Sequence, residues 1–387
     1  MDEKANISRR RLLAGAGIAL SGAVAGCTLG TPQNTEEDAR GSDRFPSEFD
    51  GPPENPDQPV ADSELSTLYE DVVDSVAAVR IEAEEGTASG TGWVYDHTSG
   101  DYVVTNEHVV RDNESPFLWF DNTGWREGTV VGTDFYSDLA VIDVLDGLPG
   151  ESTGLSLVEA PVPVGTEVVA IGNPFGLTGS FTTGIVSGRN RNIRLGGRTF
   201  SIADGIQTDA AVNRGNSGGP LVTHEGTVAG VVNAGSQQGD NVGFAISARM
   251  TRRVVPDLIT EGAFEHSRMG VLLTDVTPEL IEANELPVTY GVYIDRVQDD
   301  VPADEILRGT TGQTTVRGRD VSTGGDVIVG LSNGDTEWAT PTTERLSAFL
   351  ALYTEPGDTI GVDVVRDGER RTVEITLVER PPPPSRA

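Results

Sequence analysis

Cysteine and lysine are almost absent from this chain of 387 residues. Cys27 is its only cysteine, so the chain has no internal disulfide, and Lys4 is its only lysine. Basic residues as a class are scarce, with 28 lysines and arginines against 60 acidic residues and a formal net charge of -32. Because phosphate recognition depends on clustered basic side chains, we expect no nucleic-acid partner.

The acidic residues are spread along the whole chain instead of forming one acidic tail. Charge of a single sign repels itself and destabilises a compact fold in dilute buffer. Concentrated salt shortens the screening length to about 3 Å and removes much of this repulsion. The composition is therefore typical of a haloarchaeal-type surface, with a generic acidic protein as the alternative.

A long apolar run is also missing from the N-terminus. The small and apolar stretch from Ala14 to Ala25 is shorter than the run of about 20 residues that a spanning helix needs. It follows Ser8–Leu13, which resembles a twin-arginine export signal, and it ends in Val24–Cys27, which resembles a lipobox. We expect residues 1–26 to be a signal peptide and lipidated Cys27 to hold the mature chain on the outer face of the cytoplasmic membrane. The alternative is an incidental cysteine within the signal.

Three short segments carry residues suited to nucleophilic catalysis: Thr105–Val110 with His108, Ser137–Val141 with Asp138, and Gly215–Pro220 with Ser217. A serine hydroxyl is a poor nucleophile unless an imidazole takes its proton and a carboxylate fixes that imidazole. We therefore expect His108, Asp138 and Ser217 to form a catalytic triad. Backbone amides of Gly215, Asn216 and Ser217 are the candidate oxyanion hole, since glycines let the chain turn closely around a substrate.

The serine segment also fits the nucleophile-elbow pattern G-x-S-x-G of another hydrolase fold. Elbow enzymes place their acid and then their histidine after the serine. Here the later histidines, His224 and His266, lie in a turn-like stretch and near a probable domain boundary, and His97 lies in another turn-like stretch. Only His108 follows a strand-like run, so the order His, Asp, Ser is favoured.

The motifs together resemble the HtrA/Deg family of chymotrypsin-type serine proteases over about residues 65–380. The resemblance implies that His108 is the general base, Asp138 orients it, Ser217 is the nucleophile and Ala211 lies at the base of the specificity pocket. Glu107 departs from many relatives and would favour a protonated imidazole unless its side chain points away. The resemblance rests on these stretches: Ser89–Val94, Thr105–Val110, Ser137–Ile142, Ala170–Gly176, Gln207–Val222 and Val242–Ile246.

The fold class predicted is mostly β. Ser63 is expected to cap a short helix, and the chain from Val76 to about Ile246 reads as strands and turns only, which suits paired antiparallel barrels. A short linker follows Pro256. The expected domains are a tether over residues 27–62, a trypsin-like double-barrel protease domain over residues 63–262, a second domain over residues 263–380 and a proline-rich tail over residues 381–387.

The second domain alternates strands with helical stretches at Pro278–Asn284 and Thr342–Tyr353, and it resembles a PDZ domain. An unrelated small α+β domain is the alternative. By the resemblance, its loop formed by Met269, Gly270, Val271 and Leu272 binds the terminal carboxylate of a peptide.

The expected function is an ATP-independent serine endopeptidase acting on misfolded or exported proteins, with peptide C-termini as further partners. The alternative is a chaperone or peptide-binding module that keeps the protease fold. Nucleotide loops and metal-ligand clusters are absent from the sequence, so we expect no metal and no cofactor. The family resemblance implies a homotrimer.

Overall fold

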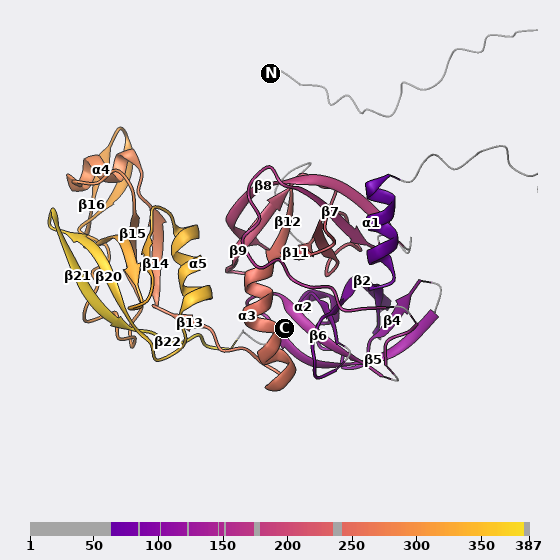
Figure 1. Ribbon diagram of the computed structural model, residues 1–387. Coiled ribbons are helices and arrows are strands. Elements are labelled where there is room, and N and C mark those ends of the chain that lie inside the picture. Colours follow the sequence, from indigo (N-terminus) through magenta and orange to yellow (C-terminus); the bar gives the residue numbers. More distant parts are fainter. Residues whose placement is uncertain are drawn as a thin grey trace, which may run out of the picture. The chain divides into compact units, whose positions relative to one another are not determined.

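The computed structural model describes residues 63–382, apart from residues 84–85, 101, 122–123, 146, 151, 174–178 and 235–241 (Figure 1). The predicted signal peptide, Cys27, the tether and most of the proline-rich tail lie outside the described residues. Within the described part, no helix is long and apolar enough to cross a membrane.

The first helix, α1 (Glu64–Val73), confirms the prediction of a helix capped by Ser63. The Ser63 hydroxyl accepts a hydrogen bond from the Ser66 amide, and the Ser66 hydroxyl accepts one from the Ser63 amide. Such a capping box satisfies amides that the first helical turn leaves without partners. Leu68 and Val72 are buried on its inner face, in a core shared with strands of both barrels.

The first closed barrel has the strand order β1-β2-β3-β6-β5-β4. Its strands β3 and β6 are antiparallel, with Thr105 opposite Ala140, so the end of β3 lies beside the start of β6. His108 follows β3 and Asp138 precedes β6, and this pairing brings the two together. The strands are β1 (Val76–Ala83), β2 (Gly86–Tyr95), β3 (Tyr102–Thr105), β4 (Phe117–Phe120), β5 (Gly124–Asp134) and β6 (Leu139–Val144).

The second closed barrel has the order β10-β11-β12-β9-β8-β7, and Ser217 lies in the turn before β10. Three of its strands, β10, β11 and β12, are buried along their whole length, as their β-branched and small residues predict. The two barrels confirm the predicted fold class. The strands are β7 (Glu167–Gly172), β8 (Ser180–Arg194), β9 (Ser201–Thr208), β10 (Pro220–Thr223), β11 (Val228–Asn233) and β12 (Gly243–Ser247).

Two helices were not predicted. The one-turn helix α2 (Glu107–Val110) carries His108, so the reading of residues 76–246 as strands and turns only was wrong. Helix α3 (Ala248–Thr260) contains Pro256 and continues to Thr260, where the sequence suggested a short linker after the proline. Ser247 caps α3, and its apolar face is buried, so packing compensates for the amide that proline lacks. The buried residues are Ala248, Met250, Thr251, Val254, Val255 and Leu258.

The C-terminal part is a mixed β and helical structure. Its main sheet has the order β14-β15-β18-β20-β21, with β19 paired to β18, so β14 is an edge strand. The helices α4 (Pro278–Asn284) and α5 (Thr343–Tyr353) confirm the two predicted helical stretches. The strands are β13 (Ser267–Arg268), β14 (Val271–Asp275), β15 (Val292–Val297), β16 (Gly312–Val316), β17 (Arg319–Thr323), β18 (Val327–Ser332), β19 (Glu337–Ala339), β20 (Thr359–Arg366), β21 (Glu369–Thr376) and β22 (Val378–Glu379).

Candidate active site

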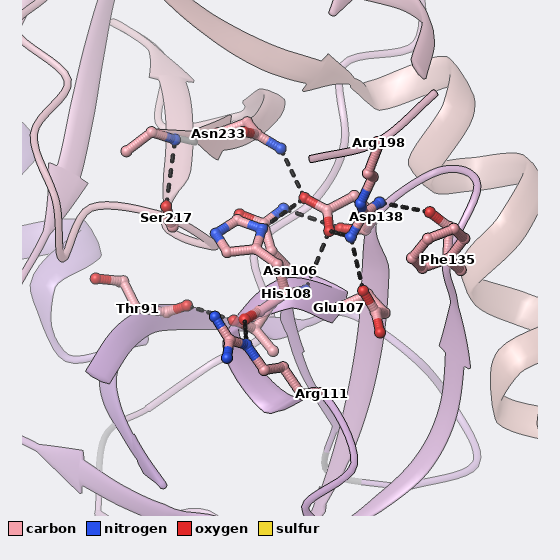
Figure 2. Close-up of polar contacts among 12 residues, drawn as sticks. Thr91, Asn106, Glu107, His108, Arg111, Phe135, Asp138, Arg198, Ser217 and Asn233 are labelled. Atoms are coloured by element: carbon pink, nitrogen blue, oxygen red, sulfur yellow. Dashed lines mark hydrogen bonds and ion pairs between the residues drawn. The ribbon is translucent and has the colours of Figure 1, made fainter. Parts of the chain in front are cut away.

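His108 and Asp138 lie against each other in the first barrel (Figure 2). His108 Nδ1 is 2.7 Å from Asp138 Oδ2, and the His108 amide donates to Asp138 Oδ1 at 3.0 Å. With its proton on Nδ1, the neutral imidazole donates to the carboxylate and leaves Nε2 free to accept a proton. The pair thus has the geometry of a general base fixed by an acid.

The backbone holds Asp138 in an uncommon conformation. Asp138 has a positive φ of 58° and is fully buried. Aspartate tolerates this left-handed region better than most residues. The Asp138 carbonyl accepts from Asn106 Nδ2 at 3.0 Å and from the Glu107 amide at 3.1 Å, so the segment before His108 fixes the turn.

Four donors reach the Asp138 carboxylate. Two come from His108, and the other two come from the second barrel: Asn233 Nδ2 at 2.7 Å from Oδ2 and Arg198 Nη2 at 2.9 Å from Oδ1. Both oxygens of this buried carboxylate therefore have hydrogen-bond donors. Asn233 and Arg198 were not predicted from the sequence, because they are far from Asp138 along the chain.

Ser217 lies in a tight turn of the second barrel. Gly215 and Gly218 have φ values of 103° and 86°, and a Cβ on Gly218 would come within 2.1 Å of the Thr91 carbonyl oxygen. Glycine is therefore required at Gly218 for both conformation and space. The turn delivers Ser217 to the junction of the two barrels.

The Ser217 hydroxyl accepts a hydrogen bond from the Ala234 amide at 3.2 Å (Figure 2). Among the polar contacts of the described residues, none joins Ser217 Oγ to His108. Bonds of this kind are often long or misaligned without substrate and tighten in the Michaelis complex.

The oxyanion-hole residues are in different situations. The Asn216 amide already donates to the Asn213 carbonyl at 3.0 Å, so it is committed to the turn. The amides of Gly215 and Ser217 therefore remain the better candidates for a developing oxyanion.

Thr91, on β2, ties the serine turn to the first barrel. Its amide donates to the Ser217 carbonyl at 2.8 Å, and its hydroxyl donates to the Gly215 carbonyl at 2.6 Å. The Thr91 carbonyl in turn accepts from the Thr105 hydroxyl at 2.6 Å, on the strand that leads to His108. One threonine thus links the segments of the predicted nucleophile and base.

Glu107 points away from the imidazole. Its side chain is buried, and Oε2 lies 2.8 Å from Arg198 Nη2. The carboxylate that precedes His108 is therefore balanced by a guanidinium.

The other histidines have local partners. His97 Nδ1 lies 2.8 Å from the Ser99 hydroxyl, and His224 lies 3.6 Å from Glu167. His266 Nε2 is 2.7 Å from Asp134 Oδ2 in a buried pair. Burial opposes ionisation of Asp134, but hydrogen bonds and charge from His266, with hydrogen bonds from Ser137, outweigh it and lower the pKa of Asp134. None of these pairs includes the predicted nucleophile.

Ala211 was predicted to lie at the base of the specificity pocket, and the loop from Met269 to Leu272 was predicted to bind a peptide carboxylate. Ala211 is exposed, and its carbonyl accepts from the Thr182 hydroxyl at 2.9 Å. Met269 is buried, Gly270 has a φ of 77°, and Leu272 is 53% exposed on the edge strand β14.

No cluster of three or more histidine, cysteine or acidic residues that could hold a metal occurs in the part of the chain that the structure describes.

Comparison with known proteins places these features in context. A family model described as a trypsin-like peptidase domain matches residues 90–231. A probable periplasmic serine endoprotease DegP-like from Bartonella henselae is 34% identical over 301 residues, 76% of this chain and 54% of the relative. Its namesake from Chlamydia trachomatis is 33% identical over 297 residues, with the same coverage of 76% and 54%. The chain spans about half the length of the curated relatives it matches.

Solved structures are similar over a larger share. The HtrA-type protease AlgW with tripeptide is 29% identical with a TM-score of 0.63, and the match covers 83% of this chain and 99% of that one. The serine endoprotease from Yersinia pestis is 24% identical with a TM-score of 0.57, covering 84% of this chain and 100% of that one, and supports the fold.

Proposed function

Because this chain contains a trypsin-like serine protease domain of the HtrA/DegP type, we propose that it is an ATP-independent serine endopeptidase. Its substrates would be misfolded or exported proteins outside the cytoplasmic membrane. The observation that carries the proposal is the 2.7 Å contact of His108 Nδ1 with the fully buried Asp138 carboxylate. This contact lies at the junction of the two barrels, where Ser217 also lies. Relatives named periplasmic endoproteases support an exported location.

In the proposed reaction, Ser217 Oγ attacks the scissile carbonyl carbon while His108 Nε2 takes the hydroxyl proton. Asp138 stabilises the imidazolium that forms, and the amides of Gly215 and Ser217 bind the oxyanion. His108 then protonates the leaving amine, and a water molecule hydrolyses the acyl-enzyme by the same steps in reverse.

The proposal is tested by incubating unfolded casein with the protein in concentrated salt and without ATP. The salt is needed because the net charge of -32 disfavours the compact fold in dilute buffer. We expect cleavage by the wild type and none by Ser217→Ala. The competing chaperone function predicts that both proteins suppress aggregation and that neither produces fragments.

Cleavage is expected after small or medium aliphatic residues. Ala211 offers no charge at the proposed base of the primary pocket, and a buried lysine or arginine of the substrate would have no counter-ion there. Mass spectrometry of the casein fragments gives the distribution of cleavage sites. Fragments ending mainly in lysine or arginine would refute this specificity.

The C-terminal part is proposed to be a PDZ domain that binds peptide C-termini. Its edge strand β14 presents a free side for strand addition, and the Met269–Leu272 loop would bind the terminal carboxylate. Gly270→Asp adds a repelling charge at that loop, so we expect loss of peptide binding and of any stimulation that peptides give. Cleavage of a minimal substrate should continue.

A matched control is needed because Gly270 has a φ of 77°, and a Cβ there would lie 2.9 Å from Val301. Gly318 has a φ of 78° and open space around it, in the turn between β16 and β17. Gly318→Asp therefore adds the same charge in the same backbone conformation away from the loop, and should preserve binding. Calorimetry measures the affinity of each protein for peptides with a free or an amidated C-terminus. Equal affinity of the wild type for both forms would rule out C-terminal recognition.

Membrane attachment is proposed to depend on lipidated Cys27. The Cys27→Ser protein should leave the membrane fraction or keep its uncleaved precursor. Unchanged fractionation and processing would remove the lipid anchor from the account.

A homotrimer is proposed from the family resemblance. Light scattering in concentrated salt measures the mass in solution, and a monomeric mass would refute it.

A further inference from the structure

Resting on the proposed function, we infer that Arg198 is a positioning residue of the triad, and that Glu107 balances its charge. Arg198 lies in the connection between β8 and β9 of the second barrel, whereas Asp138 and Glu107 belong to the first. Its guanidinium reaches across to both carboxylates (Figure 2).

The guanidinium is held from several sides. Nη1 donates to the Phe135 carbonyl at 2.6 Å, and Nη2 lies 2.8 Å from Glu107 Oε2 and 2.9 Å from Asp138 Oδ1. The ring of Phe135 lies 4.3 Å from the guanidinium carbon, and only 9% of the side chain is exposed. A planar group fixed in this way holds its partners more firmly than a flexible ammonium would.

Arg198 also helps to fix the orientation of the Asp138 carboxylate. Together with the His108 amide it binds Oδ1, while Oδ2 faces His108 Nδ1 and Asn233. Loss of the guanidinium removes one of the two donors to Oδ1, so the carboxylate is held less firmly and the imidazole can shift with it. A misplacement of about 1 Å in a catalytic group costs about a hundredfold in rate.

The net charge of the cluster formed by Asp138, Glu107 and Arg198 can be changed in single steps by substitution. With both carboxylates ionised, Asp138, Glu107 and Arg198 have one negative charge in excess. Arg198→Met raises the excess to two, Glu107→Gln reduces it to none, and the double variant restores one. Because these charges are buried, their effects on the imidazole are poorly screened.

The sign of the effect on His108 follows. Negative excess favours the protonated imidazole, which cannot act as a base. The acid limb of the kcat/KM profile should therefore move to higher pH in Arg198→Met and to lower pH in Glu107→Gln. Arg111, whose Nε donates to the His108 carbonyl at 3.2 Å, is a further charged side chain beside this segment, and it is unchanged in all variants.

The experiment compares the wild type with Arg198→Met, Glu107→Gln, the double variant and Arg198→Lys, using a short peptide substrate in concentrated salt. We expect Arg198→Met to lower kcat about tenfold to a hundredfold with little change in KM. The two single variants should shift the acid limb by about one pH unit in opposite directions. The double variant should return the limb to the wild-type position, and Arg198→Lys should keep it there with reduced kcat.

A second readout does not need turnover. The Nδ1 proton in the His108–Asp138 hydrogen bond gives a low-field proton NMR signal, and its pH midpoint should move in the same two directions. If Arg198→Met does not fold, Glu107→Gln still tests the shift to lower pH, and Arg198→Lys tests whether another cation there keeps the wild-type midpoint. Midpoints of Arg198→Met and Glu107→Gln that move in the same direction, or a midpoint that stays fixed in folded Glu107→Gln, would overturn the role of Arg198.

The two proposals fail separately. If the wild type cuts no peptide but the NMR midpoints of Arg198→Met and Glu107→Gln move in opposite directions, the endopeptidase proposal is refuted and the role of Arg198 is supported. A wild type that cuts peptides but whose variants show no shifts refutes the cluster alone.

Discussion

Replacing Ser217 or His108 by alanine is expected to lower turnover of a peptide substrate about 10⁶-fold. Either change removes nucleophilic attack as a pathway and leaves only binding and oxyanion stabilisation. Because the two residues act as a unit, the double variant should be no slower than either single variant. Ser156→Ala, at an exposed serine between β6 and β7, is the matched control and should retain activity.

Near-normal hydrolysis by Ser217→Ala would defeat the assignment of the nucleophile. Hydrolysis that survives in His108→Ala alone would instead point to another base. Single-turnover kinetics on purified proteins separates these cases, since a trace of contaminating protease gives a rate that does not scale with active sites.

Asp138→Asn is expected to lower kcat about 10⁴-fold while leaving the fold in place. The carboxylate accepts from His108, Asn233 and Arg198, and an asparagine amide cannot accept from all of these donors. Its NH₂ group facing Nδ1 would select the tautomer with the proton on Nε2, which cannot take the serine proton.

The control for this change is Asp143→Asn, on the same strand β6 and outside the triad. Its kcat should stay close to that of the wild type. A loss of less than about tenfold in Asp138→Asn would mean that Asp138 does not orient the base.

Local signals explain why much of the fold was predictable. Ser63, Pro278 and Thr342 are helix-start signals, and the helices begin where they indicate. Each capping interaction involves residues within one turn, so the sequence contains it in full. The short β-branched runs likewise predicted both barrels, because strand type depends on alternation and bulk within a few residues.

Helix α3 escaped prediction because two local rules disagree there. Pro256 argues against a helix interior, whereas Ser247 is a good cap. Burial of Val254, Val255 and Leu258 outweighs the lost amide, and that burial exists only once the barrels are formed.

The supporting residues of the site were missed for a similar reason. His108 and Asp138 were found because they occur in recognisable strings, but Thr91, Arg198 and Asn233 contact them or Ser217 across the junction of the barrels. Thr91 lies in the family-like stretch Ser89–Val94, but that string does not indicate which residues it contacts. Nothing near Arg198 or Asn233 in the sequence distinguishes them from other polar side chains. Glu107 was noticed, but its partner Arg198 depends on the closure of both barrels.

The central claim is that His108 and Asp138 activate Ser217 as a nucleophile. Its most direct test is reaction of the folded protein with a fluorophosphonate, followed by intact mass and peptide mass spectrometry. The account predicts one phosphonyl group per chain, on Ser217, with its formation abolished in Ser217→Ala and strongly slowed in His108→Ala. A folded wild type that stays unlabelled, or one labelled equally fast in His108→Ala, would contradict it.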